Sequence, residues 1–102
     1  MLYLMMDESC GKLLVKVGET RDLKSRRRSY KSHNPLAIMR SSCAGTEIAE
    51  EYCHKELAKL GERVPRTEWF VVSETVFNYL YTMGMKAFFT DRNIYMEEEF
   101  PK

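Results

Sequence analysis

Two short apolar stretches lie near the start of the chain. These stretches cover residues 2–6 and 13–18, and a polar, glycine-containing segment separates them. Successive side chains on a strand point to opposite faces, so Leu13, Val15 and Val17 share one face of the second stretch. We predict that the two stretches are strands that pair as a β-hairpin.

The segment after this hairpin is polar and basic, and it predicts a helix that ends near Lys31. Thr20 or Asp22 can cap its first turn, because a side-chain oxygen there accepts a hydrogen bond from a free backbone N–H group. Leu23 and Tyr30 lie two turns apart, so the helix offers the core only a narrow apolar stripe. A proline then disfavours helix at the residue before it, which ends the segment.

The remainder of the chain predicts two more strands and two more helices. Residues 36–42 and 68–72 are typical of short strands, and residues 63–65 of a loop. Residues 47–60 have the apolar period of a helix that ends at a glycine. The last helix is capped by Ser73, and its inward stripe is expected to contain Val76, Phe77, Leu80 and Tyr81.

The predicted order of elements is β-β-α-β-α-β-α. This order predicts an α+β fold, in which a small central antiparallel or mixed sheet of three to four strands is flanked by three helices. A chain of 102 residues suits one core, so we expect a single domain over residues 1–90. Residues 91–102 include three consecutive glutamates and are expected to form a loose acidic tail.

Composition narrows the class of protein further. No apolar run approaches the ~20 residues of a membrane span, and the N-terminus lacks the basic segment and cleavage site of a signal peptide. Cys10, Cys43 and Cys53 are odd in number and form no C-x-x-C motif, which argues against a disulfide framework or a zinc knuckle. Cys43 or Cys53 could bind a metal together with His54, but buried cysteines are the simpler interpretation. We therefore expect a reduced cytoplasmic protein with no membrane partner.

Positive charge is concentrated in one segment. The net charge is only +1, but residues 16–40 contain eight basic and two acidic residues, so this segment carries +6 and the rest −5. Such segregation favours contact with a polyanion, although a solvated basic helix is the alternative. The basic side chains expected to follow a nucleic-acid backbone are Arg21, Lys24, Arg27, Arg28 and Lys31.

Several short motifs follow one another at a characteristic spacing. Tyr3 lies on the first strand, Lys16-Val17-Gly18 ends the second, and Arg26 follows eight residues after that glycine. Glu50 lies on the second helix, and Glu68-Trp69-Phe70 begins the last strand. In this order the motifs resemble the GIY-YIG nuclease superfamily, above all its compact phage and mobile-element branch (the meiotically up-regulated/phage-ORF type domain).

This resemblance covers about residues 2–72 and has three departures. The second-motif tyrosine of the family is Lys16 here, a position that is usually apolar is Arg27, and the histidine of the family falls at Tyr30. The first two changes make the surface more basic, and they leave open whether catalysis is retained.

The resemblance implies a metal-dependent endonuclease that hydrolyses DNA phosphodiester bonds with low intrinsic sequence specificity. Glu50 would hold Mg²⁺ or Mn²⁺, and Arg26 would bind the scissile phosphate. Tyr3 would orient or deprotonate the attacking water, and Lys16 could lower the pKa of Tyr3 or be the base itself. His54, one turn beyond Glu50, could accept a proton or orient the carboxylate.

Each of these residues also has an ordinary structural interpretation. Glu50 can be an exposed helix glutamate, Tyr3 a strand aromatic at the edge of the core, and Lys16 an outward strand lysine. The fold can equally serve as a catalytically inactive nucleic-acid- or protein-binding module, for example a phage factor acting against a host system. A small basic adaptor for an acidic partner is a third hypothesis.

Partners and site geometry complete the sequence-based expectations. DNA is the expected partner, and a homodimer or a protein partner could add the specificity that a small domain lacks. If the endonuclease hypothesis is right, Tyr3, Lys16, Arg26 and Glu50 converge on one concave surface, within roughly 10 Å of one another.

Overall fold

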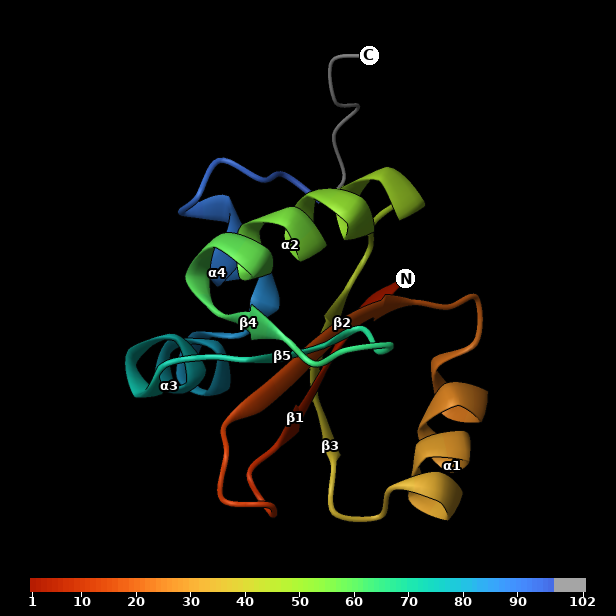
Figure 1. Ribbon diagram of the computed structural model, residues 1–102. Helices are drawn as coiled ribbons and strands as arrows, with labels where there is room; N and C mark the ends of the chain where they lie inside the picture. The colour runs from red at the N-terminus through yellow and green to blue at the C-terminus, as the bar shows by residue number, and fades with distance from the viewer. Residues whose placement is uncertain (97–102) are drawn as a thin grey trace.

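The structure of the protein is a computed structural model, in which residues 1–96 are described. Its centre is a sheet in which every pair of neighbouring strands is antiparallel, with the order β3-β1-β2-β5-β4 (Figure 1). The elements are β1 (Leu2–Asp7), β2 (Leu14–Glu19), α1 (Leu23–His33), β3 (Ile38–Cys43), α2 (Glu47–Leu60), β4 (Glu62–Arg63), β5 (Trp69–Val71), α3 (Glu74–Met83) and α4 (Met85–Thr90).

The predicted α+β class, with helices flanking a small sheet, is confirmed. Two short elements are additional to the prediction, so the described part of the chain has five strands and four helices. β4 lies at the start of the segment expected to be a loop and pairs with β5. α4 follows Gly84, whose φ of 87° lies in the left-handed region that favours glycine and therefore separates α4 from α3.

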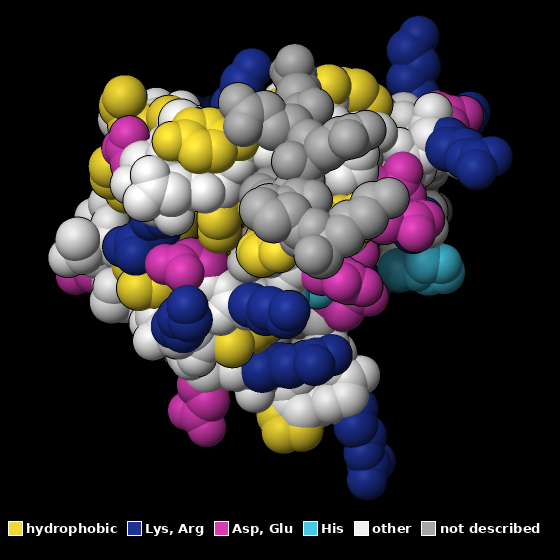
Figure 2. All heavy atoms as spheres, turned by 90° about the horizontal axis from the view of Figure 1, so that it is seen from above, with side chains coloured by type: hydrophobic (Ala, Val, Ile, Leu, Met, Phe, Trp, Pro, Cys, Tyr) yellow, Lys and Arg dark blue, Asp and Glu magenta, His cyan; other side chains and the backbone are white. Residues whose placement is uncertain are grey.

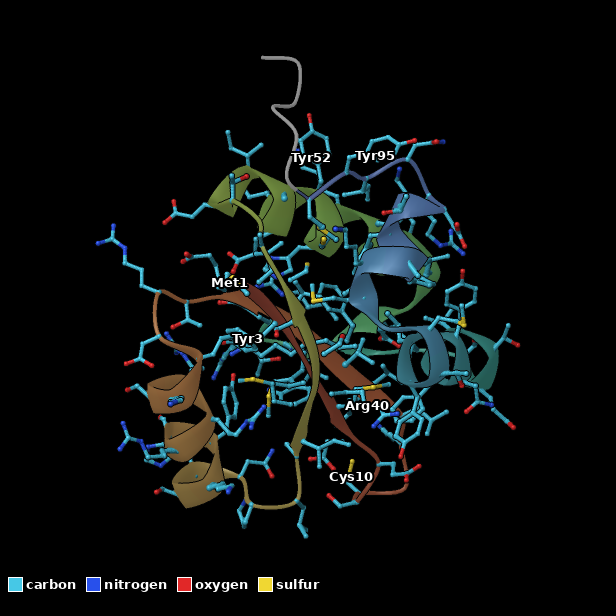
Figure 3. All side chains as sticks on the ribbon, turned by 180° about the vertical axis from the view of Figure 1, so that it is seen from behind. Met1, Tyr3, Cys10, Arg40, Tyr52 and Tyr95 are labelled. Atoms are coloured by element: carbon cyan, nitrogen blue, oxygen red, sulfur yellow. The ribbon has the colours of Figure 1, made fainter. Side chains whose placement is uncertain are left out.

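β1 lies between β3 and β2 in the sheet and is buried on both faces. Leu2, Leu4 and Met6 belong to the main hydrophobic core together with side chains of α2, α3 and α4. Tyr3, on the opposite face, packs its ring against Tyr30 of α1. Three helices thus cover one face of the sheet and α1 covers the other (Figure 3).

α1 is held by its cap and by few apolar contacts. Asp22 is the cap of the two candidates, and its side chain accepts a hydrogen bond from the Ser25 amide at 3.0 Å. The helix buries no residue completely, and only Leu23 and Tyr30 are half-buried, as the narrow stripe predicted. Its basic side chains are therefore exposed.

Two expectations for the C-terminal third differ from the structure. Tyr81 was expected to face inward, but it is 44% exposed, because it lies beyond the Val76–Leu80 stripe and stacks on the Arg40 guanidinium of β3. Residues 91–96 were expected to be loose, but Ile94 and Met96 are buried in the core. The three glutamates of the expected acidic tail lie outside the described residues.

None of the helices within residues 1–96 combines the length and apolar character that crossing a membrane requires.

Candidate functional site

The site forms where β5 ceases to cover the edge of β2. The ladder between these strands ends at the pair Lys16–Trp69, and β2 continues to Glu19. Beyond that pair, Nε2 of His54 on α2 lies 2.7 Å from the carbonyl oxygen of Val17. A carbonyl oxygen only accepts, so Nε2 carries the proton and donates it. This hydrogen bond joins α2 to β2 and places the first turns of α2 beside the site.

The glycine of the second motif gives Tyr3 its position. Gly18 is the direct partner of Tyr3 in the β1–β2 ladder. A Cβ atom built at residue 18 would overlap the Cζ and Oη atoms of Tyr3 and lie 2.8 Å from its Cε1. The phenol ring therefore lies over the backbone of Gly18, and Tyr3 lines a pocket that also contains side chains from the other side of β2.

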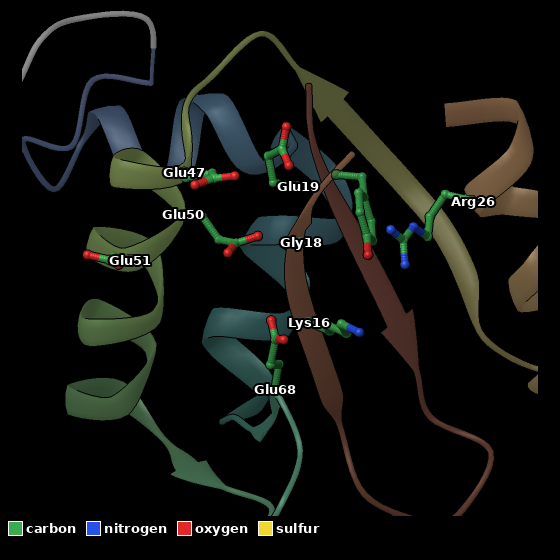
Figure 4. Close-up of a pocket in the computed structure, with 9 residues that line it drawn as sticks. Lys16, Gly18, Glu19, Arg26, Glu47, Glu50, Glu51 and Glu68 are labelled. Atoms are coloured by element: carbon green, nitrogen blue, oxygen red, sulfur yellow. The ribbon is translucent and has the colours of Figure 1, made fainter. Parts of the chain in front are cut away.

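This pocket has a volume of about 300 Å³ and brings together all four residues that were expected to converge, Tyr3, Lys16, Arg26 and Glu50. Its two sides carry opposite charge. Arg26 extends toward it from α1 and Lys16 comes from β2, whereas the acids lie on the side of α2 (Figure 4). The remaining lining residues are Gly18, Glu19, Glu47, Glu51 and Glu68.

Three side chains on the acidic side are close enough to share a cation. One ligand atom from each of Glu50, His54 and Glu68 lies within 4.8 Å of the others. Nε2 of His54 is hydrogen-bonded to Val17 and lies 3.6 Å from a carboxylate oxygen of Glu68. The two carboxylates, and not this imidazole nitrogen, are therefore the candidate metal ligands. Carboxylate oxygens are the ligands that Mg²⁺ and Mn²⁺ prefer. These residues therefore fit a divalent cation.

The protonation of Glu50 reflects its crowded surroundings. Burial raises the pKa of Glu50, and the charges of Glu68, Glu19 and Glu47 raise it further, although His54 opposes them. The acidic side thus holds more negative charge than its own basic neighbour offsets. A bound cation would relieve this repulsion and favour the ionised carboxylate.

The surroundings of Tyr3 favour its neutral phenol form. Burial and a hydrogen bond with Tyr30 raise its pKa above the ordinary value, and Arg26 only partly opposes this. The Arg26 guanidinium carbon lies 5.9 Å from the centre of the Tyr3 ring, whereas the Lys16 ammonium lies over the ring of Tyr30, at 5.3 Å. The direction of this pKa shift is opposite to the one that a general base needs.

Sequence reasoning missed two contributors to this site. Glu68 was assigned only to a segment that closes the fold, but its carboxylate reaches the pocket. Tyr30 was assigned to the apolar stripe of α1, but it contacts both Tyr3 and Lys16. Two features of the sequence could have indicated these contributions. Glu68 is an acid directly before a strand that pairs with β2, and Tyr30 is an aromatic residue with a hydroxyl group where the family has a histidine.

The five basic residues expected to follow a nucleic-acid backbone are all exposed. Four lie on α1 and Arg21 lies just before it. At the end of the molecule where α2 lies, Lys and Arg side chains are interspersed with acidic ones (Figure 2). Their role in binding remains a prediction.

The protein is a small α+β domain in which the basic helix α1 covers one face of the sheet. Its pocket of opposite charges lies at the part of β2 that β5 leaves uncovered. The model of the T5orf172 domain family matches residues 1–81, which include β1 to β5 and most of α3. The chain therefore belongs to the T5orf172 domain family, a phage-ORF-type family of the nuclease-associated group. No curated protein and no solved structure matches the chain.

Proposed function

We propose that this protein is a metal-dependent endonuclease that hydrolyses phosphodiester bonds of DNA with low intrinsic sequence specificity. The observation that carries the proposal is the presence of opposite charges in one pocket, with five glutamates that include Glu50 and Glu68 on one side, and a guanidinium and an ammonium on the other. A bound phosphodiester is stabilised by cations, and metal-dependent hydrolysis also requires metal ligands close to the phosphate. Membership of a nuclease-associated family supports the same function.

Glu50 and Glu68 would hold Mg²⁺ or Mn²⁺, which when bound neutralises charge on the phosphate and on the leaving oxygen. His54 acts on this pair as a positioning residue. Its hydrogen bond to Val17 fixes the turn of α2 that carries Glu50, and its ring lies beside the Glu68 carboxylate. The hypothesis that His54 accepts a proton is not supported at Nε2, because that nitrogen donates.

Arg26 would bind the scissile phosphate. Its guanidinium extends from α1 toward the pocket, and two of its N–H groups can donate to two oxygens of one phosphate. Lys16 would contribute a second positive charge from β2. Such fixed cations stabilise the charge that accumulates on the phosphorus centre during attack.

Tyr3 would orient the attacking water through its hydroxyl group. Because its pKa is raised, the phenol keeps its proton at neutral pH and acts as a hydrogen-bond partner. Deprotonation of the water then belongs to another group. Lys16 is the other candidate base that the sequence suggests, as the alternative to its role as a cation, because only the neutral amine can accept a proton.

Plasmid cleavage tests this proposal. With Mg²⁺ or Mn²⁺ the wild type should nick or linearise supercoiled DNA, and chelation should stop the reaction. Glu50→Ala and Arg26→Ala should each lower the rate by about 10²-fold or more. Two variants of exposed residues outside the pocket, Lys12→Ala and Glu62→Ala, serve as matched controls for lost charge. The proposal is wrong if none of the proteins cuts, or if the wild type and both pocket variants cut equally.

A second candidate function is binding of nucleic acid or protein without cleavage, as in a phage factor acting against a host system. Two observations favour it. The pKa of Tyr3 is raised, which is unfavourable for a general base, and Lys16 occupies the position of the second-motif tyrosine. Inactive protein with a steep negative dependence of DNA affinity on salt would favour this candidate. Absence of a steep salt dependence of DNA binding would argue against a nucleic-acid ligand and favour a protein partner.

The proposed partner is DNA, recruited through the exposed basic residues of α1 and by a homodimer or a protein partner where specificity is required. A cytoplasmic location is part of the same proposal, and the odd number of cysteines without a C-x-x-C motif favours it.

A further inference from the structure

A second cavity lies beside the first, between α1 and the edge strand β3. Its volume is also about 300 Å³, within the range of small-ligand sites. Arg27 and Lys31, one turn apart on α1, contribute two exposed cations to its wall. Tyr30, Ala37 and Met39 contribute aromatic and apolar surface. Nothing in the proposed hydrolytic chemistry uses this cavity.

The chemistry of this cavity suits an unpaired nucleotide. Cations on the rim match a phosphate, and an aromatic ring with aliphatic neighbours matches the faces of a base. Met39 of β3 is the ladder partner of Met5, which lies on the sheet face that α1 covers, and it is only partly buried, so apolar surface is left for a ligand. A phosphate and a base together account for both the charge and the apolar surface.

The two cavities are linked by adjacent residues. Arg26 lines the first and Arg27 lines the second. Tyr30 lines the second, and its ring lies 6.1 Å from that of Tyr3, which lines the first. A strand whose scissile phosphate lies at Arg26 is therefore placed to present a neighbouring phosphate to Arg27 and the attached base to the second cavity.

The loop that closes the second cavity is tied to the sheet. The side-chain amide of Asn34 donates to the carboxylate of Asp7 on β1, at 3.3 Å. The Ala37 amide donates to the Asn34 carbonyl oxygen at 3.1 Å, which forms the turn before β3. The wall that carries Ala37 is thus held in place before any ligand arrives, which lowers the entropic cost of binding.

We propose that this cavity binds one unpaired nucleotide next to the phosphate at Arg26, so that the preferred substrate is single-stranded or locally unpaired DNA. This inference rests on the proposed function, because it uses the first pocket as the place of the scissile phosphate. A base inside an intact duplex is stacked and paired, so entry would require it to be flipped out at a cost. DNA that is already unpaired avoids this cost.

Binding without cleavage provides the test. Fluorescence anisotropy in EDTA compares a short labelled single strand with its duplex, and a 2-aminopurine in the strand reports stacking of a base. Ala37→Phe fills the cavity without changing charge, and the double variant Arg27→Ala/Lys31→Ala removes the rim cations. Lys12→Ala is the single-charge control, and circular dichroism checks the fold of each variant.

The wild type should bind the single strand at least about tenfold tighter than the duplex. Ala37→Phe should weaken single-strand binding by about fivefold or more, as loss of one stacked base predicts, and duplex binding by less than about twofold. The 2-aminopurine signal should fall on binding to the wild type but not to Ala37→Phe. If Ala37→Phe does not fold, Arg27→Ala/Lys31→Ala, which changes only exposed residues, provides the comparison of single-strand and duplex affinity.

The outcomes separate this inference from the proposed function. If the wild type binds both DNA forms equally, or the folded variants keep the single-strand preference, the second cavity is not a nucleotide site. Cleavage in Mg²⁺ that Glu50→Ala abolishes would leave the proposed function standing in that case. If single-strand preference is lost in the cavity variants but no DNA is cut, the nucleotide site is supported and the endonuclease proposal fails.

Discussion

The ring of Tyr3 occupies the space that any side chain at residue 18 would need. The two residues are direct partners in the β1–β2 ladder, and a Cβ at Gly18 would overlap the end of the phenol ring. Gly18 does not have the positive φ found at Gly11 and Gly84, so glycine is required here for space and not for backbone conformation. One missing side chain on β2 therefore sets the position of a pocket residue on β1.

Gly18→Ala should destabilise the protein by about 1–3 kcal/mol, the usual cost of overpacking. The sign is informative, because replacing glycine by alanine within a strand is otherwise stabilising. In a Tyr3→Ala background the same substitution should cost much less, since the overlapping atoms are gone. Urea unfolding of the four proteins in this double-mutant cycle measures the coupling. Equal costs in both backgrounds would show that the ring does not need the space.

The sequence predicts the fold well where local patterns decide it. The hairpin, the cap at Ser73 and the apolar period of α2 follow from residue type and spacing, whereas the choice of Asp22 over Thr20 as the cap of α1 came from the structure. β4 has only two residues and exists through its pairing with β5, so no pattern within it predicts a strand. Residues 91–96 pack through isolated apolar side chains, Ile94 and Met96, which have no period to recognise.

The candidate site divides in the same way. Tyr3, Lys16, Arg26 and Glu50 could be selected from motif spacing, and they do line one pocket. Glu68 could not be placed, because its position depends on where β5 ends its pairing with β2. The direction of the Tyr3 pKa shift also depends on burial and on Tyr30, both of which are tertiary features.

Tyr3 should not ionise at or below its ordinary pKa of 10, because burial and Tyr30 raise that pKa in the folded protein. The ultraviolet tyrosinate titrations of the wild type and Tyr3→Phe should therefore coincide up to about pH 10. Arg26→Ala should raise the pKa of Tyr3 further, because the guanidinium opposes the shift. An ionisation below pH 10 that Tyr3→Phe removes would contradict this account and restore Tyr3 as a candidate base.

His54→Ala should destabilise the protein by about 1–3 kcal/mol, because the buried Val17 carbonyl loses its side-chain donor. His54→Gln retains an N–H donor and should recover part of this loss. If the protein cleaves DNA, His54→Gln should also keep more activity than His54→Ala, since a positioning residue tolerates a replacement that keeps the hydrogen bond. Chemical denaturation and plasmid cleavage of both variants provide the readouts. Complete and equal loss of activity in two stable variants would instead indicate proton transfer by His54.

Glu50 should make the metal-free protein less stable as pH rises. Its folded pKa is raised above the ordinary value of 4.5, so the folded state binds more protons than the unfolded state between these two values. Stability contributed by this group therefore falls as pH rises from 4.5 through the folded pKa and stays constant above it. The unfavourable contribution is absent at pH 3.5, below both pKa values, and is fully present only above the folded pKa.

Glu50→Gln removes this contribution, so its effect on the free energy of unfolding should be more favourable at pH 7.5 than at pH 3.5. Addition of Mg²⁺ at pH 7.5 should stabilise the wild type, because a ligand that binds only the folded state raises its stability, and should do less for Glu50→Gln. Urea unfolding at both pH values, with and without Mg²⁺, measures these differences, and Glu62→Gln, outside the pocket on β4, is the matched control. An effect of Glu50→Gln that is the same at both pH values would mean that Glu50 is not shifted in the folded protein. Equal Mg²⁺ responses of wild type and Glu50→Gln would exclude Glu50 as a metal ligand, because loss of a ligand must reduce the stabilisation that Mg²⁺ produces.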